Sequence, residues 1–233
     1  GTTGAFTLCW DRPLAGDDLA WSIPSPVAPN LFNVGGPLTT AGAALDWLVR
    51  DALDCADYSQ ALEEAAGVEP GADRLLFSPY LAGEPLTIGP DTRGAFLGLS
   101  VHHRAPHMVR AVLEGVAFAG RTILDSLLEA GGRVSEVVSF GGQVRSSLWN
   151  QIKSDIWNRP LCIHQVDDAG CLGAAAIAAV GVGAYGSLQE ASEHMVRIGR
   201  RFLPDPERAA YYGRAYLAYS AMRPALEPVF TRL

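Results

Sequence analysis

Cysteine is scarce in this 233-residue chain, and its four cysteines lack the paired spacing of structural sites. None of them forms a CxxC motif, which argues against a disulfide framework or a zinc ribbon and favours a reducing, cytoplasmic location. The cysteines are Cys9, Cys55, Cys162 and Cys171. The first residues contain neither an initiator Met nor a signal sequence, so we expect the chain to be part of a longer protein.

Long apolar runs and an excess of basic charge are also missing. The longest weakly polar stretch, 172–185, is rich in Ala and Gly and falls short of the roughly 20 residues of a membrane-spanning helix. Eighteen basic residues face 25 acidic ones, which gives a formal charge of -7. This charge repels nucleic acid and anionic lipid, so we expect neither as a partner, and any phosphate ligand must be held by local contacts.

Several familiar catalytic and binding motifs are absent. The sequence contains no Walker GxxxxGK[ST] pattern and no GxSxG elbow. Residues 181–186 match GxGxxG, but they follow a predicted helix instead of joining a strand to one. His102, His103 and His107 cluster without a dependable helical pair, because Pro106 separates them. We therefore predict solvated or capping histidines and no metal site.

The first fifty residues predict strands followed by a helix. Pro and Gly between the first two strands favour a hairpin, and the third strand runs into a turn at Gly35–Gly36. Thr39 or Thr40 is then expected to cap a helix with one apolar face. The strands are expected at 5–10, 19–23 and 31–34, and the apolar face comprises Ala44, Leu45, Leu48 and Val49.

The remainder predicts an α/β domain around a long insertion, 51–132. Strand and helix then alternate, which is typical of a parallel sheet. The tail is helical, with an interruption near Pro224, and no linker or repeat suggests more than one domain. The expected elements are a helix at 59–66, an extended stretch at 75–83, a strand at 94–99, a long buried helix at 106–130, a strand at 134–140, a helix at 147–158, a strand at 161–164 and helices at 170–182 and 206–230.

Glycine turns at predicted strand ends carry the main chemical signal. They occur at 1–4, at Gly35–Gly36 and at Gly141–Gly142, with helices expected to start near Thr40 and Ser147. Glycine lets backbone N–H groups approach a phosphate, and a helix start adds partial positive charge. Each turn alone is compatible with plain structure, but together they predict a nucleotide site. Asp168, just before Gly170, is expected to start a helix.

Five segments together resemble the C-terminal half of the FGGY family of carbohydrate kinases. Residues 94–99 and, seven residues later, 107–114 resemble the second signature of that family. The others are PYLAGE at 79–84, DTRG at 91–94, GGQVRSSLW at 141–149, which is similar to the adenosine loop GGGARSPLW, and DAGCLGAA at 168–175. This chain departs from the family at Gln143, where a third glycine is usual, and at Asp168, where Glu is usual.

The resemblance implies an α/β fold: an actin-like ATPase (ribonuclease H-like) domain with a mixed sheet flanked by helices and a long helical insertion. Residues 1–233 would form the C-terminal nucleotide-binding domain, without the N-terminal sugar-binding domain. Carried over by position, the ATP-binding residues would be Gly1 and Thr2 at the phosphates, Gly42 and Asp46 on a helix beside the nucleotide, and Gly141, Gly142 and Ser146 at the adenosine.

The implied activity is transfer of a phosphoryl group from ATP, with Mg²⁺, to a sugar hydroxyl. The catalytic Asp of the family lies upstream of the matched segments, so this chain would hold no catalytic residue and would be inactive alone. The Arg-Ser-x-Leu-Trp wording at 145–149 favours the xylulokinase and gluconokinase branches and a ketopentose such as xylulose. The expected partners are the sugar, the missing N-terminal domain and a second copy in a homodimer.

Two other interpretations stay open. One is an actin-like nucleotide-binding module without kinase activity. The other is a purely structural α/β domain in which the glycines serve turns alone.

Overall fold

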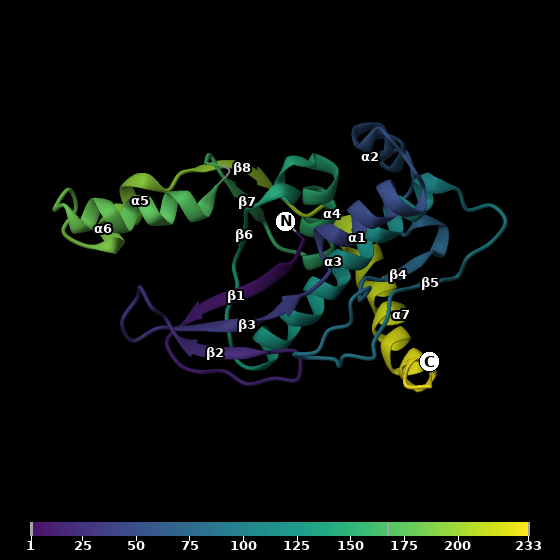
Figure 1. The fold of residues 1–233 in the computed structure, drawn as a ribbon, viewed down its shortest axis with the longest axis horizontal. Helices are drawn as coiled ribbons and strands as arrows, with labels where there is room; N and C mark the ends of the chain where they lie inside the picture. Colours follow the sequence, from purple (N-terminus) through teal and green to yellow (C-terminus); the bar gives the residue numbers. More distant parts are fainter. Residues whose placement is uncertain (1, 167, 233) are drawn as a thin grey trace.

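The computed structural model describes residues 2–166 and 168–232, which form a mixed α/β fold (Figure 1). Its strands are β1 (Gly4–Trp10), β2 (Trp21–Pro24), β3 (Phe32–Leu38), β4 (Leu76–Ser78), β5 (Ala95–Leu97), β6 (Val137–Ser139), β7 (Leu161–His164) and β8 (Ile198–Phe202). Its α-helices are α1 (Gly42–Asp46), α2 (Tyr58–Ala66), α3 (Ala105–Glu129), α4 (Ser147–Trp157), α5 (Ala169–Gly181), α6 (Leu188–Met195) and α7 (Pro206–Phe230). A π-helical segment, η1 (Trp47–Ala52), continues α1, and two short 3-10 helices are η2 (Ala72–Arg74) and η3 (Gly142–Arg145).

β3 is the central strand of the first sheet and pairs antiparallel with both β1 and β2. The predicted hairpin between the first two strands is therefore wrong, because the more buried third strand lies between them. The predicted turn at Gly35–Gly36 is also wrong, since β3 continues through both glycines. A Cβ on Gly35 would lie 1.8 Å from the carbonyl oxygen of Phe6, so the strands approach where only glycine fits.

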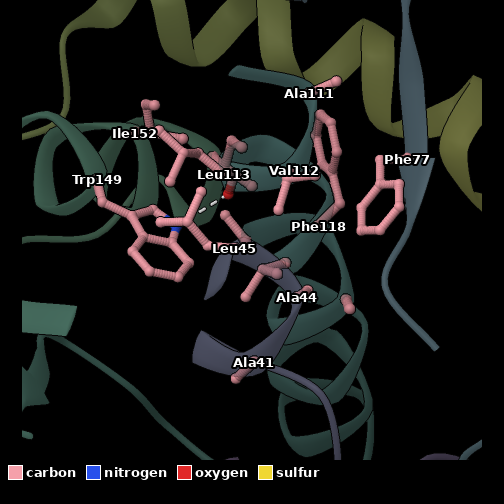
Figure 2. Close-up of a cluster of buried hydrophobic side chains, with 14 of the residues drawn as sticks. Ala41, Ala44, Leu45, Phe77, Ala111, Val112, Leu113, Phe118, Trp149 and Ile152 are labelled. Atoms are coloured by element: carbon pink, nitrogen blue, oxygen red, sulfur yellow. Dashed lines mark hydrogen bonds between the residues drawn. The ribbon is translucent and has the colours of Figure 1, made fainter. Parts of the chain in front are cut away.

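The core forms around α3. The prediction that this helix is mostly buried is confirmed. Figure 2 shows Val112 and Leu113 of α3 packed among Leu45 of α1 and Trp149 and Ile152 of α4. The indole Nε1 of Trp149 donates a hydrogen bond of 3.0 Å to the Leu113 carbonyl oxygen. The predicted apolar face of the α1 segment is confirmed, because all four of its residues are fully buried: Ala44, Leu45, Leu48 and Val49.

The predicted insertion, 51–132, contributes α2, η2, β4 and β5 as well as the central helix α3. The short helix is confirmed, and β4 pairs antiparallel with β5. The extended stretch expected at 75–83 is a strand only to Ser78, after which the chain turns through Gly83, whose φ is +75°. β4 itself ends where Pro79, which has no backbone N–H, follows Ser78.

The second large sheet, β6–β7–β8, is mixed. β6 and β7 are parallel, as the alternation of strand and helix predicted, but β8 pairs antiparallel with β7. The elements α4, β7 and α5 are confirmed within a residue of their expected ends, whereas β8 and α6 were not predicted. β8 has little apolar patterning because it is an edge strand with four exposed residues.

α7 is one continuous helix, so the predicted interruption near Pro224 is wrong. Pro224 lies on the exposed side, where the carbonyl oxygen four residues earlier can bond to water instead. The opposite side buries Tyr212, Tyr219 and Met222. This burial stabilises the helix through the proline.

Candidate functional site

Thr2 lies against the start of α1. Its carbonyl oxygen accepts hydrogen bonds of 3.2 Å from the backbone N–H groups of Ala41 and of Ala43. The entry to β1 is therefore fixed beside Gly42, the first residue of the helix, which is buried. The structure brings together these two predicted site residues, while Gly1 falls outside the described residues.

The threonines expected to cap this helix have other partners. Thr39 donates from its backbone N–H and its hydroxyl to the buried carboxylate of Glu84, both at 2.7 Å. The hydroxyl of Thr40 donates to the carbonyl oxygen of Pro79. Ala41 occupies the cap position without a side-chain hydrogen bond, so the predicted Thr cap is wrong. The two threonines instead pack the loop 79–84 against the link between β3 and α1.

Asp46 ends α1 with its side chain exposed. The charge of Asp46 acts on Tyr58 of α2. Burial of the Tyr58 phenol raises its pKa to about 12, and the negative charge of Asp46 makes a smaller contribution in the same direction. Asp46 therefore lies on the outer side of the helix, opposite the apolar face. It is available to a polar ligand.

Gly141 and Gly142 form an exposed turn after β6, with Gly142 as the first residue of η3. Gly141 has a φ of +85°, a left-handed conformation that favours glycine. Gly142 does not need this freedom, yet no atom lies within 4 Å of the position that a Cβ would occupy there. The space beside its backbone is open.

Ser146 follows η3 and caps α4. Its Oγ accepts a hydrogen bond of 3.2 Å from the backbone N–H of Trp149. This bond satisfies one of the free N–H groups in the first turn of the helix. The expected helix start is confirmed, and the serine hydroxyl can still donate its proton to a ligand.

Trp149 links the two parts of the predicted site. It is in the first turn of α4, and Figure 2 shows Leu45 of α1 beside its indole. Thr2 contacts the start of α1, and α1 packs against α4 through Leu45 and Trp149. Gly35 and Gly36 do not join them, because they lie inside β3. The structure connects Thr2 to α1 and Ser146 to α4, and a shared site for the N-terminal and Gly141–Gly142 turns stays a prediction.

Lys153 is a residue of this region that the sequence pattern does not single out. It is the only lysine of the chain, yet its side chain is buried and its Nζ donates a hydrogen bond of 2.7 Å to Oε1 of Gln143 in η3. Burial lowers the pKa of this amine to about 7. Its neighbours in sequence are mostly polar, so the one available signal was that the chain has only one lysine.

The predicted histidines and Asp168 act at helix starts and turns. Nδ1 of His107 accepts from the Arg104 backbone N–H at 3.2 Å, and Nδ1 of His103 accepts from Ser100 at 2.8 Å. Asp168 caps α5 by accepting from Cys171, as predicted. No cluster of three or more His, Cys, Asp or Glu suited to a metal is found among residues 2–166 and 168–232.

The family model for the C-terminal domain of the FGGY family of carbohydrate kinases matches residues 1–182. A gluconokinase from Bacillus licheniformis is 31% identical over 246 residues, covering 100% of this chain and 47% of that protein. A xylulose kinase from Bacillus subtilis is 31% identical over 81% of this chain and 38% of its own length. The chain spans about half the length of the curated relatives it matches, or less.

The fold agrees with solved structures. Xylulose kinase from Rhodospirillum rubrum superposes with a TM-score of 0.88 at 31% identity, covering 99% of this chain and 47% of that one. Gluconate kinase from Lactobacillus acidophilus also gives 0.88, at 27% identity, over 100% of this chain and 47% of its own. Within the described residues, no helix is both long and apolar enough to cross a membrane.

Proposed function

Because this chain belongs to the FGGY family of carbohydrate kinases, with their α/β, actin-like fold, we propose that it is the ATP-binding half of an enzyme that transfers the γ-phosphate of ATP to a sugar hydroxyl. The observation that carries the proposal is the exposed Gly141–Gly142 turn. Open space beside Gly142 and a helix start directly after the turn suit the approach of a nucleotide to the backbone.

Each site residue has a role in this proposal. Thr2, with Gly1, binds the phosphates, while Gly42 and Asp46 lie beside the nucleotide. The adenosine is held by three residues of the segment before α4, namely Gly141, Gly142 and Ser146. Backbone N–H groups hold the ligand here, which suits a chain with a formal charge of -7.

When bound, ATP with Mg²⁺ supplies the phosphoryl group and neutralises charge on the phosphate oxygens, which are usual ligands of this metal in kinases. The residues of this chain bind and orient the nucleotide. We assign the general base, an Asp, and the residues that bind the sugar to an N-terminal half. The twofold greater length of the relatives supports this division.

α5 supports the same division. Its sequence, AGCLGAAAIAAVG, is almost wholly apolar, yet none of its residues is buried. Figure 1 shows α5 and α6 extending away from the rest of the molecule, and Ile177 on α5 is 54% exposed. An apolar groove there is lined by α5, α6 and Val27 of the β2–β3 loop. A continuous apolar surface of this kind marks an interface, and we propose that the N-terminal half covers it.

We propose xylulose, a ketopentose, as the sugar, because the Rhodospirillum rubrum xylulose kinase has the same fold at 31% identity. Gluconate is the second candidate. The gluconokinase from Bacillus licheniformis matches the whole chain, including residues beyond 182.

The test is an assay of ADP release with a panel of sugars and sugar acids. We expect the complete protein to release ADP with one of them, and this chain alone to show no sugar-dependent release, because transfer requires both sides of the cleft. Sugar-dependent turnover by the chain alone would contradict the proposed division. ATP binding without phosphorylation of any sugar by the complete protein would favour an actin-like module without kinase activity.

A further inference from the structure

Lys153 is held beneath the turn that we assign to the adenosine. Its side chain lies in α4 with 4% exposed surface, and Nζ lies 4.6 Å from the centre of the Trp149 ring. The acceptor of its hydrogen bond is Oε1 of Gln143. No ion pair involves this amine in the part of the chain that the structure describes.

The turn is fixed from two sides. The carbonyl oxygen of Val144 accepts from Nδ2 of Asn150 at 2.8 Å and from Nη2 of Arg200 at 2.7 Å. The side chain of Gln143 is fixed by Lys153. Lys153 and Asn150 lie on α4, and Arg200 lies on β8. The hydrogen bonds to Gln143 and Val144 therefore connect the turn to one helix and one strand.

No neighbouring charge contributes to the shifted pKa of the Lys153 amine. Charged groups on the elements around α4 have other partners: Arg121 of α3 donates to the Ile156 carbonyl oxygen, Arg200 of β8 donates to Val144, Arg201 of β8 pairs with Glu136, and Arg208 of α7 pairs with Asp155, while Arg145 of η3 is exposed. Burial without a compensating charge lowers the pKa of Lys153 to about 7. The amine therefore gains or loses its proton near neutral pH.

We propose that Lys153 is a positioning residue that holds the Gly141–Arg145 turn, through Gln143, in the conformation that receives the nucleotide. The inference rests on the proposed ATP site, but Lys153 itself touches no ligand. The neutral amine stays under the turn and donates to Gln143. The charged amine needs water, which it reaches only by leaving that position, so protonation loosens the turn.

Two variants test this coupling. Lys153→Met keeps the length of the side chain without its donor, and Gln143→Leu removes the acceptor. Each is expected to weaken ATP binding by about two- to tenfold at pH of about 8, the range of one net hydrogen bond. The double variant should bind no more weakly than the single ones, because both remove the same contact.

The pH profile separates positioning from a merely structural role. Calorimetry should show ATP affinity of the unmodified 233-residue chain falling as the pH is lowered from about 8 to about 6. The fall should disappear in both Lys153→Met and Gln143→Leu, because each removes the contact through which the amine holds the turn. Circular dichroism melts identify a variant that has failed to fold, and the other variant then carries the test.

The single lysine also allows a direct measurement. In chain labelled with ¹³C-lysine, one side-chain signal should titrate with a midpoint near 7, and ATP should lower that midpoint because it favours the neutral amine. A midpoint near the usual 10.4 would overturn the inference. If ATP binds but does not shift the midpoint, and both variants bind ATP as tightly as the unmodified chain, this inference is overturned while the proposed function stands. Failure of the unmodified chain to bind ATP would overturn the proposed function and this inference together.

Discussion

Glu114 is a buried carboxylate of α3 that joins distant parts of the chain. It accepts hydrogen bonds from Arg110 Nε at 2.7 Å, from the Gly71 backbone N–H at 3.0 Å and from the Tyr212 hydroxyl at 2.7 Å. Arg110 in turn donates to the carbonyl oxygen of Val68 and to Tyr212. The network connects the segment after α2 with α3 and α7. Loss of one member leaves a buried charge without its partner.

Glu114→Gln is therefore expected to lower the free energy of unfolding by about 3–5 kcal/mol. The matched control is Asp125→Asn, which breaks the more exposed pair of Asp125 with Arg121, 3.5 Å apart on the same helix. This control should cost less than about 1 kcal/mol. Urea denaturation of both variants measures the difference. Equal effects would show that the buried network does not stabilise the fold in this way.

The buried amine of Lys153 makes the stability of the fold depend on pH. Between its folded-state pKa, about 7, and its unfolded value near 10.4, the unfolded chain binds more protons than the folded chain. Its contribution to the free energy of unfolding therefore rises with pH across this interval, by up to about 1.4 kcal/mol per pH unit. The difference between unmodified chain and Lys153→Met, measured by urea denaturation from about pH 7 to 9.5, isolates this contribution. Parallel stability curves would contradict a buried neutral amine.

Sequence reasoning succeeded for residues whose role is local. Asp168 caps the helix directly after it, and His107 acts within its own first turn. It failed for Thr39, which looks like a helix cap but bonds to Glu84, 45 residues away. The burial of Lys153 likewise depends on tertiary contacts. A local sequence pattern does not show which distant residues a side chain will meet.

At the scale of elements, apolar periodicity predicted α3, α4 and β7, because each carries its own burial pattern. Strand order was not predicted, since the pairing of β3 with both neighbours depends on contacts between segments. The extension of β3 through Gly35 has the same origin. Glycine looks like a turn residue until the neighbouring backbone is known.

Gly35→Ala tests this account of β3. The added Cβ would lie 1.8 Å from the Phe6 carbonyl oxygen, so we expect a loss of at least about 2 kcal/mol in the free energy of unfolding. Gly173→Ala is the matched control, because no atom lies within 4 Å of its Cβ position in α5. There the same substitution should stabilise the helix by up to about 1 kcal/mol. Thermal melts compare the two, and a harmless Gly35→Ala would contradict the close approach.

At the scale of the whole molecule, α5 is the feature that the isolated chain does not explain. Its apolar surface predicts that Ile177→Cys is alkylated readily in this chain and at least about tenfold more slowly in the complete protein, where an interface would exclude the reagent. Leu217→Cys on α7, where the leucine is 71% exposed, is the control and should react equally in both. Peptide mass spectrometry measures each site. Equal reactivity at position 177 would contradict coverage by the N-terminal half, and protection that depends on the concentration of the isolated chain would indicate a second copy instead.

The most direct test of the ATP site is a calorimetric titration of this chain and of its Gly142→Val variant with ATP. The fold has room for the valine, since a Cβ at Gly142 meets no atom within 4 Å, so the variant should melt at nearly the same temperature. The added side chain would fill the space proposed for the nucleotide. We predict that the unmodified chain binds ATP and that the variant binds at least about tenfold more weakly. Binding that is equal in both, or absent from the unmodified chain, would contradict the account.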